Sequence, residues 1–281
     1  MLRPFAQVDV FSAVAYRGNP VAVVLDADGL DTDAMQRFAA WTNLSETTFV
    51  LPPTPEGSAA GADYRLRIFT PGGELPFAGH PTLGSAHAWL GAGGVPRGTT
   101  TVVQECAAGL VPVRRDDSAL SFRAPDLVRS GPLEPDVLQR AVQALGLAVG
   151  DVLEHQWVDN GPGWAALRLA SAQDVLAVEV DRTLLGDLAL GVVGLHPPGS
   201  PHQVEVRAFV PELGVPEDPV TGSLNAGLAQ WLTGNGVLPP AYTAAQGARV
   251  GRAGVVRVRT VQGRVWVGGD STTCVSGTVQ L

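Results

Sequence analysis

An internal repeat constrains the fold of this sequence more than any other feature. Residues 80–90 align without gaps to residues 218–228, and five of the eleven aligned pairs are identical. Just before them, residues 67–71 (RIFTP) and 207–211 (RAFVP) agree at three of five positions. The copies lie much further apart than the ~20–50 residues of a solenoid repeat, so they indicate duplication of a whole strand-and-helix unit. We therefore expect two similar domains related by a pseudo-twofold axis.

The composition supplies enough apolar residues for two cores. The chain has 281 residues, of which 45% are hydrophobic and 16% charged, and this balance is typical of a folded protein. Its 34 glycines and 22 prolines follow no period, which indicates many short elements joined by tight turns. We expect a strand-rich α+β fold. One domain is placed at residues 1–117, with a last strand at 268–281, and the other at residues 118–267.

Local patterns predict individual elements. A helix is expected from Asp31 or Thr32, either of which can cap it, to Thr42, because Met35 and Phe38 follow helical spacing. Strands are predicted at residues 8–11, 20–25, 45–51, 64–68, 100–103, 110–113, 120–122, 255–261, 264–267 and 278–281, and further helices at 81–90 and 134–145.

The charged residues exclude several classes of protein. All 19 basic residues are arginine, and the chain contains no lysine. It therefore cannot form a pyridoxal phosphate Schiff base, supply a Walker A lysine or use a lysine enamine. The 27 acidic residues give a net charge of −8, which argues against a nucleic-acid surface. Small molecules are the expected partners.

The cysteines and the apolar segments favour a cytoplasmic protein. Cys106 and Cys274 form no CxxC motif, and a chain of this size needs no disulfide. No stretch approaches the ~18 apolar residues of a membrane span. The first residues turn polar before a signal peptide could develop. We expect a soluble cytoplasmic protein without membrane contact.

The start of each repeated helix is a candidate ligand site. Each start combines a proline with glycine and hydroxyl residues, and its free N–H groups and positive dipole end favour anions. If the two starts face one another across the interdomain cleft, they would hold a small carboxylate from both sides. Gly79 and Gly222 would let a substrate approach the backbone closely. Thr82 and Ser223 supply hydroxyl groups there.

His80 and Asp218 are expected at equivalent N-cap positions, so the cleft would carry one imidazole and one carboxylate. The alternative is that Asp218 only caps a helix and that His80 is a polar loop residue. The symmetry-related placement favours the functional interpretation. No HxxxH or HExxH motif suggests a metal site.

Glu46 is the third candidate for acid–base chemistry. It falls in a predicted strand beside Phe49 and Val50, where glutamate is disfavoured. Burial there would raise its pKa toward the range in which a carboxylic acid exchanges protons near neutrality. The alternative is a glutamate on the outer face of the strand. Because neither a dinucleotide fingerprint nor a GxSxG elbow is present, cofactor-free acid–base chemistry remains.

Several long motifs resemble the phenazine-biosynthesis PhzF family. They are residues 8–11 (VDVF), 18–23 (GNPVAV), 43–47 (NLSET), 67–71 (RIFTP), 74–82 (ELPFAGHPT) and 217–223 (EDPVTGS). The resemblance extends to residue 269. It implies a diaminopimelate-epimerase-like fold with two similar domains, each a β-barrel-like sheet around a central helix, and a site between them.

The resemblance also implies roles for the candidate residues. In the PhzF isomerase a single glutamate moves a proton within dihydrohydroxyanthranilate without a cofactor, and the matching residue here is Glu46. His80, Asp218 and Ser223 would orient the substrate and share protons, and the glycines would contribute backbone donors. Related epimerases carry a cysteine at each helix start. Because Cys106 and Cys274 lie elsewhere, a two-cysteine racemase is excluded. A homodimer is expected from the family.

This chain departs from the family pattern just after the second motif. The family often continues with Ala-His, whereas this chain has Leu224 and Asn225. The substrate therefore stays open. We expect an isomerase that moves a proton within a small cyclic or amino-acid-like carboxylate, and Arg252 is a candidate partner for a second substrate anion. The alternative is a non-catalytic member of the same fold that binds or scaffolds small carboxylates.

Overall fold

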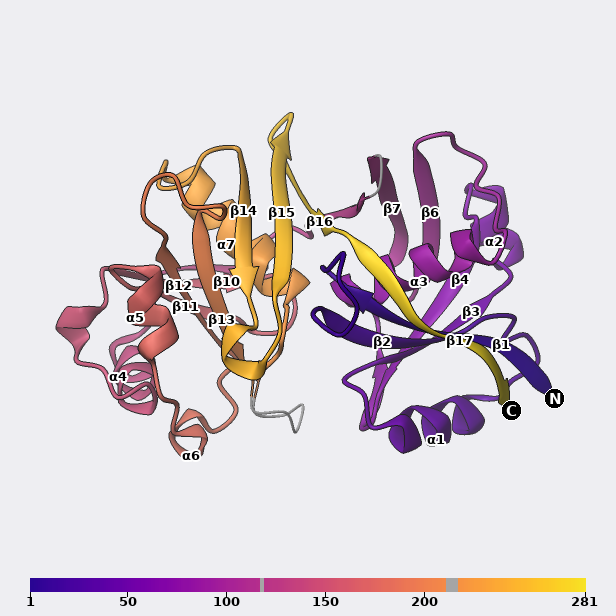
Figure 1. The fold of residues 1–281 in the computed structure, drawn as a ribbon, viewed down its shortest axis with the longest axis horizontal. Helices are drawn as coiled ribbons and strands as arrows, with labels where there is room; N and C mark the ends of the chain where they lie inside the picture. Colours follow the sequence, from indigo (N-terminus) through magenta and orange to yellow (C-terminus); the bar gives the residue numbers. More distant parts are fainter. Residues whose placement is uncertain (117–118, 211–216) are drawn as a thin grey trace. The chain divides into compact units, whose positions relative to one another are not determined.

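Figure 1 shows a computed structural model of the chain, which describes residues 1–116, 119–210 and 217–281. The chain divides into two compact units. Unit 1 contains residues 1–123 and 268–281, and unit 2 contains residues 124–267. The expected domain boundary at 117/118 and Pro211 of the repeat lie outside the described residues.

Unit 1 is a mixed sheet in which β17 pairs with β1, and the order continues β1, β2, β3, β4, β6, β7, β8. The pairs β2–β3 and β4–β6 are parallel, and the other pairs are antiparallel. Its strands are β1 (Leu2–Val10), β2 (Asn19–Val24), β3 (Thr47–Leu51), β4 (Tyr64–Thr70), β5 (Gly73–Leu75), β6 (Thr101–Cys106), β7 (Gly109–Asp116), β8 (Ala119–Arg123) and β17 (Ser271–Gln280).

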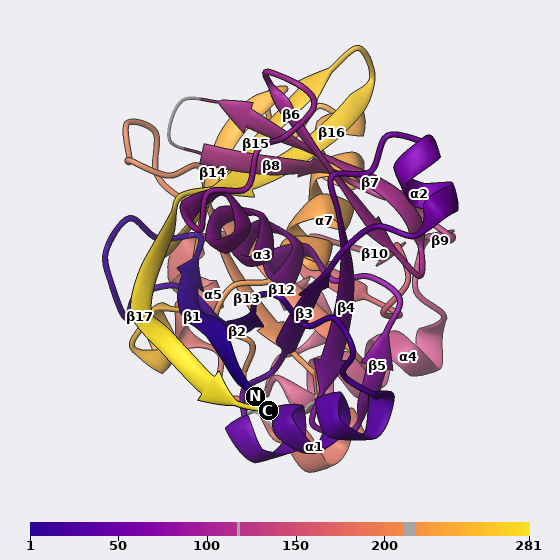
Figure 2. The ribbon, with the colours of Figure 1, turned by 90° about the vertical axis from the view of Figure 1, so that its right-hand side faces the viewer.

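The sheet of unit 1 wraps around helix α3 (Gly79–Gly91), whose first eight residues are all buried. Figure 2 shows α3 among β1, β2, β3 and β8. Helix and sheet approach closely because Gly84 has no side chain. A Cβ atom there would lie 2.4 Å from a methyl carbon of Val21, so any larger residue would push the helix off the sheet.

Helix α1 (Thr32–Thr42) covers the other face of this sheet. Asp31 caps it by accepting a hydrogen bond from the N–H of Ala34, as the sequence predicted. Its buried Met35 packs against Phe49 and Phe69. Because side chains alternate along a strand, Phe69 faces α1 whereas its neighbour Ile68 faces α3. A short helix, α2 (Pro55–Ala59), precedes β4.

Unit 2 repeats this order of strands. Its strands are β9 (Arg129–Gly131), β10 (Glu154–Asp159), β11 (Ala165–Arg168), β12 (Leu190–Leu195), β13 (Val204–Phe209), β14 (Ala241–Gln246), β15 (Gly254–Val261) and β16 (Arg264–Gly269). From β10 to β15 the successive pairings are antiparallel, parallel, antiparallel, parallel and antiparallel. The pairings from β1 through β4 and β6 to β7 have the same sequence of orientations. The duplication inferred from the sequence is therefore present in the fold.

The central helix of unit 2 is α7 (Gly222–Gly234), most of whose residues are buried. Gly227 allows it to approach β10, because a Cβ there would lie 2.3 Å from the carbonyl oxygen of Val158. Helices α4 (Pro135–Ala144), α5 (Ala172–Ala177) and α6 (Arg182–Leu185) cover a core that includes Trp157, Leu167 and Val192. A strand after residues 160–162, where β11 lies, was indicated by the sequence, but no bounds were predicted for β10–β14.

Within the described ranges, the chain has no helix both long and apolar enough to cross a membrane.

Candidate active site

A buried carboxylate–imidazole pair lies in unit 1. Glu46 directly precedes β3, and His80 is the second residue of α3. Nε2 of His80 lies 3.4 Å from Oε2 of Glu46, and the two side chains are 7% and 9% exposed. The sequence placed Glu46 within a strand, which is wrong by one residue. The outward-facing alternative is also wrong, because Glu46 is buried.

The environment keeps His80 neutral. Burial lowers its pKa from 6.5 to about 3, and a hydrogen bond with the backbone of Pro20 opposes this shift only in part. Nδ2 of Asn19 lies 3.3 Å from Nδ1 of His80. Asn19 and the backbone of Pro20 therefore both contact the ring of His80. Nε2 is the ring nitrogen that lies nearest the carboxylate of Glu46.

The first turn of α3 offers backbone donors but few free hydroxyls. The N–H groups of a first turn have no partner within the helix, and Pro81 has none, so Gly79 and His80 supply the donors here. Thr82 is fully buried, and its Oγ1 accepts a hydrogen bond of 3.1 Å from Gln104. Its hydroxyl is thus engaged inside unit 1.

In unit 2, a hydrogen-bond network holds the start of α7. Oδ2 of Asp218 accepts a hydrogen bond of 2.6 Å from the hydroxyl of Thr221. Oε1 of Gln246 accepts from the N–H of Thr221 at 3.0 Å and from Nδ2 of Asn225 at 2.9 Å. Nε2 of Gln246 donates to the carbonyl of Asp218 and to Oγ1 of Thr221. One amide at the end of β14 therefore ties together the residues around this helix start.

Ser223 lies in the first turn of α7. Its Oγ accepts a hydrogen bond of 2.9 Å from Nε1 of Trp164, and its carbonyl accepts one from Asn160. Ser223 is half-buried. The hydroxyl proton is not used in the bond with Trp164, so it can be donated to another group.

The residues that depart from the family pattern point into unit 2. Leu224 is fully buried and packs where Gly191 leaves room, because a Cβ at Gly191 would lie 2.4 Å from a methyl carbon of Leu224. Asn225 donates to the carbonyl of Thr221 as well as to Gln246. Asn225 thus stabilises the helix start rather than extending away from it.

The expected N-cap roles of His80 and Asp218 are wrong. Ala78 and Thr221 are the N-caps, so α3 begins one residue before His80 whereas α7 begins four residues after Asp218. The hydrogen bonds explain the difference. Asp218 forms a backbone bridge with Ala208 of β13, which keeps the chain extended past the point at which α3 is already helical.

The structure places the predicted residues in two groups. Glu46, His80 and Gly79 lie together in unit 1, with Thr82 one turn further along the helix. Asp218, Gly222 and Ser223 surround the start of α7 in unit 2. Sequence reasoning missed Asn19 and Gln246. Asn19 had a signal, since its GNP motif echoes residues 160–162.

No group of three or more histidine, cysteine, aspartate or glutamate residues in the described part of the chain is arranged to hold a metal ion.

Comparisons with known proteins agree with this arrangement. The chain matches the PhzC-PhzF family model, described as phenazine biosynthesis-like protein, over residues 8–277. It is 37% identical to antisense-enhancing sequence 1 of Schizosaccharomyces pombe, over 97% of each chain. It is 35% identical to trans-2,3-dihydro-3-hydroxyanthranilate isomerase of Pseudomonas aeruginosa, over 88% of this chain and 87% of that protein.

Solved structures show the same fold. A PhzF-family protein from Enterococcus faecalis superposes with a TM-score of 0.83 at 26% identity and covers all of both chains. A hydroxyproline epimerase from Agrobacterium vitis has a TM-score of 0.58 at 14% identity, covering 99% of this chain and 92% of that one, which shows the fold alone. The expected α+β epimerase-like fold is confirmed.

Together, the fold and the relatives define the class of this protein as an isomerase with an epimerase-like architecture. More specifically, the chain belongs to the PhzC-PhzF family of phenazine biosynthesis-like proteins, as its motifs indicated.

Proposed function

We propose that this isomerase moves a proton within a small cyclic or amino-acid-like carboxylate, with Glu46 as its single acid–base residue and without a cofactor. The observation that carries this proposal is the buried contact of Glu46 with the neutral imidazole of His80. A carboxylate shielded from water can take a proton from carbon and return it to another carbon of the same substrate. Relatives named trans-2,3-dihydro-3-hydroxyanthranilate isomerase support this class of substrate.

His80 has a positioning and donor role in this proposal. A proton on its Nε2 atom would stabilise the nearby carboxylate of Glu46 in the resting enzyme. When Glu46 becomes protonated, the same N–H group is released and can stabilise negative charge on the substrate. Asn19 contacts the opposite ring nitrogen and helps to hold the ring in this orientation.

Unit 2 serves mainly to bind the substrate in this proposal. Asp218 and Ser223 would contact its polar groups, and the N–H groups around Gly222 would bind its carboxylate. The network of Gln246 supports these positions without taking part in proton transfer. We further propose a cytoplasmic homodimer that binds no nucleic acid, in keeping with the net charge of −8.

Proton NMR in deuterated water tests the proposal. Wild type, Glu46→Gln and the control Glu56→Gln are each incubated with dihydrohydroxyanthranilate and a panel of cyclic and amino-acid carboxylates. Glu56 is an exposed glutamate of α2, so its variant should behave as wild type. We expect isomerisation or deuterium incorporation at carbon for wild type and the control, and neither for Glu46→Gln. Equal turnover by Glu46→Gln would overturn the proposal, and binding without exchange would favour the non-catalytic alternative.

A further inference from the structure

A cavity of about 130 Å³ lies in unit 1 on the face of β4 that α1 covers. It lies at the edge of β4, where the neighbouring strand changes from β6 to β5. β4 pairs with β6 at Tyr64 and Arg65 and with β5 from Ile68 to Thr70. In the part of the chain that the structure describes, no strand pairs with this edge at Leu66 and Arg67. Side chains alternate between the two faces of β4. Helix α3, which carries His80, packs against the face opposite the cavity.

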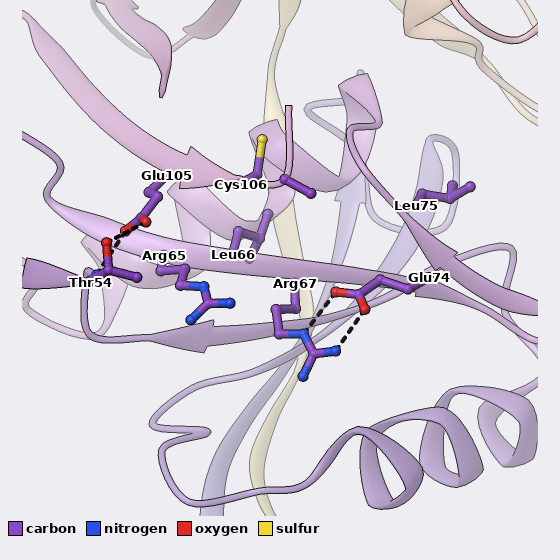
Figure 3. A pocket seen from close by; sticks show the side chains of 9 residues that line it. Thr54, Arg65, Leu66, Arg67, Glu74, Leu75, Glu105 and Cys106 are labelled. Atoms are coloured by element: carbon purple, nitrogen blue, oxygen red, sulfur yellow. Dashed lines mark hydrogen bonds and ion pairs between the residues drawn. The ribbon is translucent and has the colours of Figure 1, made fainter. Parts of the chain in front are cut away.

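Two of the four charged side chains that line this cavity form an ion pair with one another. Arg67 binds Glu74 through two hydrogen bonds, from Nε at 2.7 Å and from Nη2 at 2.6 Å. This bidentate geometry neutralises both groups and fixes them in place. Figure 3 shows this pair on one side of the Arg65 side chain and the pair Thr54–Glu105 on the other.

The other two charges have no counterion. Glu105 accepts hydrogen bonds from the N–H of Thr54 at 2.8 Å and from its hydroxyl at 2.7 Å. Among the described residues, neither Glu105 nor the half-buried Arg65 forms an ion pair, although the two are register neighbours on β4 and β6. Glu105 is instead bound by Thr54 at the start of α2, and its carboxylate lies close to the backbone of Gly57. A Cβ at Gly57 would lie 2.2 Å from the Glu105 carboxylate.

The remaining lining is apolar and limits the size of a ligand. Leu75, Ala107 and Cys106 lie around the charges, and burial raises the pKa of the Cys106 thiol so that it stays neutral. This volume has room for several water molecules. It thus accommodates a molecule of the size of glycine, alanine or serine.

We propose that this cavity binds a small zwitterionic α-amino acid, with its carboxylate on the guanidinium of Arg65 and its ammonium group on the carboxylate of Glu105. A planar guanidinium recognises a carboxylate through two parallel hydrogen bonds. Glu105 keeps lone pairs for an ammonium donor while Thr54 holds it in place. The site is independent of the reaction proposed for Glu46.

Isothermal titration calorimetry on the full chain tests this inference. The probes are glycine and L-alanine. Acetate and ethylammonium serve as half-ligands, which carry only the carboxylate or only the ammonium group. L-Phenylalanine serves as a ligand too large for the cavity. We expect millimolar or tighter binding of glycine and alanine, at least tenfold weaker binding of both half-ligands, and no binding of phenylalanine. Absence of heat with glycine and alanine at millimolar concentration overturns the proposal.

Variants locate the binding. Arg65→Met and Glu105→Gln should each weaken alanine at least tenfold, whereas the exposed controls Arg37→Met and Glu56→Gln should leave its affinity unchanged. Ala107→Leu at the exposed rim keeps every charge but reduces the cavity, so it should also abolish binding and serves if Arg65→Met does not fold. Binding that survives in Arg65→Met or Ala107→Leu and disappears in Glu46→Gln places the amino acid at the proposed active site and overturns the inference.

Discussion

The starts of α3 and α7 occupy matching places in two units with the same strand order, but they carry different chemistry. Thr47 of β3 pairs with Phe69, and Leu190 of β12 pairs with Phe209, so the residue before the strand is Glu46 in unit 1 and Ala189 in unit 2. The position before the strand therefore carries a buried carboxylate beside the start of α3 in unit 1 and only a methyl group in unit 2. Duplication kept the backbone and changed the side chains.

The polar contacts differ in the same way. Nε2 of His80 lies 3.4 Å from Oε2 of Glu46, and both side chains are buried. The aligned Asp218 accepts a short hydrogen bond from Thr221, and Gln246 binds the neighbouring backbone. Gln246 does not titrate, so its contacts hold a fixed geometry over a wide pH range. In our proposal, unit 1 therefore moves the proton and unit 2 binds the substrate.

The largest effect is expected from removing the acid–base group. Glu46→Gln should lower kcat about 10²–10⁴-fold, the usual contribution of general acid–base catalysis, and leave KM within a few-fold. Asp218→Asn should mainly raise KM, because its proposed role is in binding. Steady-state kinetics on the substrate found by NMR measures both. If Asp218→Asn lowers kcat as much as Glu46→Gln does, the division of labour between the units is wrong.

A second contrast lies in two aligned arginines. Arg207 and Glu217 form a buried pair at 2.8 Å, with side chains 7% and 5% exposed, whereas Arg67 and Glu74 are 17% and 35% exposed. Arg207→Met should cost roughly 3–5 kcal/mol of unfolding free energy, because it leaves a buried carboxylate without its cation. Arg67→Met should cost about 0–1 kcal/mol, since water screens the pair that it breaks.

Urea unfolding of both arginine variants measures this difference, with circular dichroism as the readout. Methionine is the matched substitution in each case because it keeps the length of the side chain and removes the charge. Equal losses of unfolding free energy for the two variants would show that burial does not determine how much these ion pairs stabilise the fold.

The sequence predicted those helices and strands whose patterns depend on neighbouring residues, and it missed the others. The cap at Asp31 and the strand alternation at Tyr64–Ile68 depend on neighbouring residues, and both were predicted. Buried strands such as β12 (LGVVGL) carry no polar alternation, so they were missed.

The candidate site was predictable in part for the same reason. The repeat and the family motifs pointed to Glu46, His80 and Asp218. The helix starts were wrong because the bridge between Asp218 and Ala208 comes from another strand. The contact of Gln246 with Thr221 spans 25 residues, and no local pattern reports it.

The neutral state of His80 gives a pH-dependent prediction. Its pKa is about 3 in the folded protein and 6.5 in the unfolded chain. As pH falls below about 6.5, only the unfolded chain takes up this proton, so His80 progressively destabilises the fold until about pH 3. At pH 8 both states are neutral and no such effect exists.

His80→Gln should therefore flatten the loss of stability between pH 6.5 and pH 5, where the imidazole accounts for roughly 2 kcal/mol. Urea unfolding of wild type and variant at pH 8, 6.5 and 5 measures the two slopes. Parallel slopes would mean that His80 takes up its proton in the folded state as easily as in the unfolded chain. Unit 2 has an aspartate at the aligned position, so no matching effect is expected there.

The smallest effect is expected at two aligned serines. Ser85 of α3 is fully buried and shares a hydrogen bond of 2.8 Å with Thr48, whereas the half-buried Ser223 of α7 accepts from Trp164. Ser85→Ala should cost roughly 0.5–1.5 kcal/mol of stability and leave KM unchanged. Ser223→Ala should raise KM several-fold, because the proposed donor to the substrate is lost, with a similarly small effect on stability. Each variant is the control for the other, since each removes one hydroxyl at the aligned position of a central helix. If Ser85→Ala raises KM and Ser223→Ala does not, substrate binding belongs to unit 1, and the assignment of the two units must be exchanged.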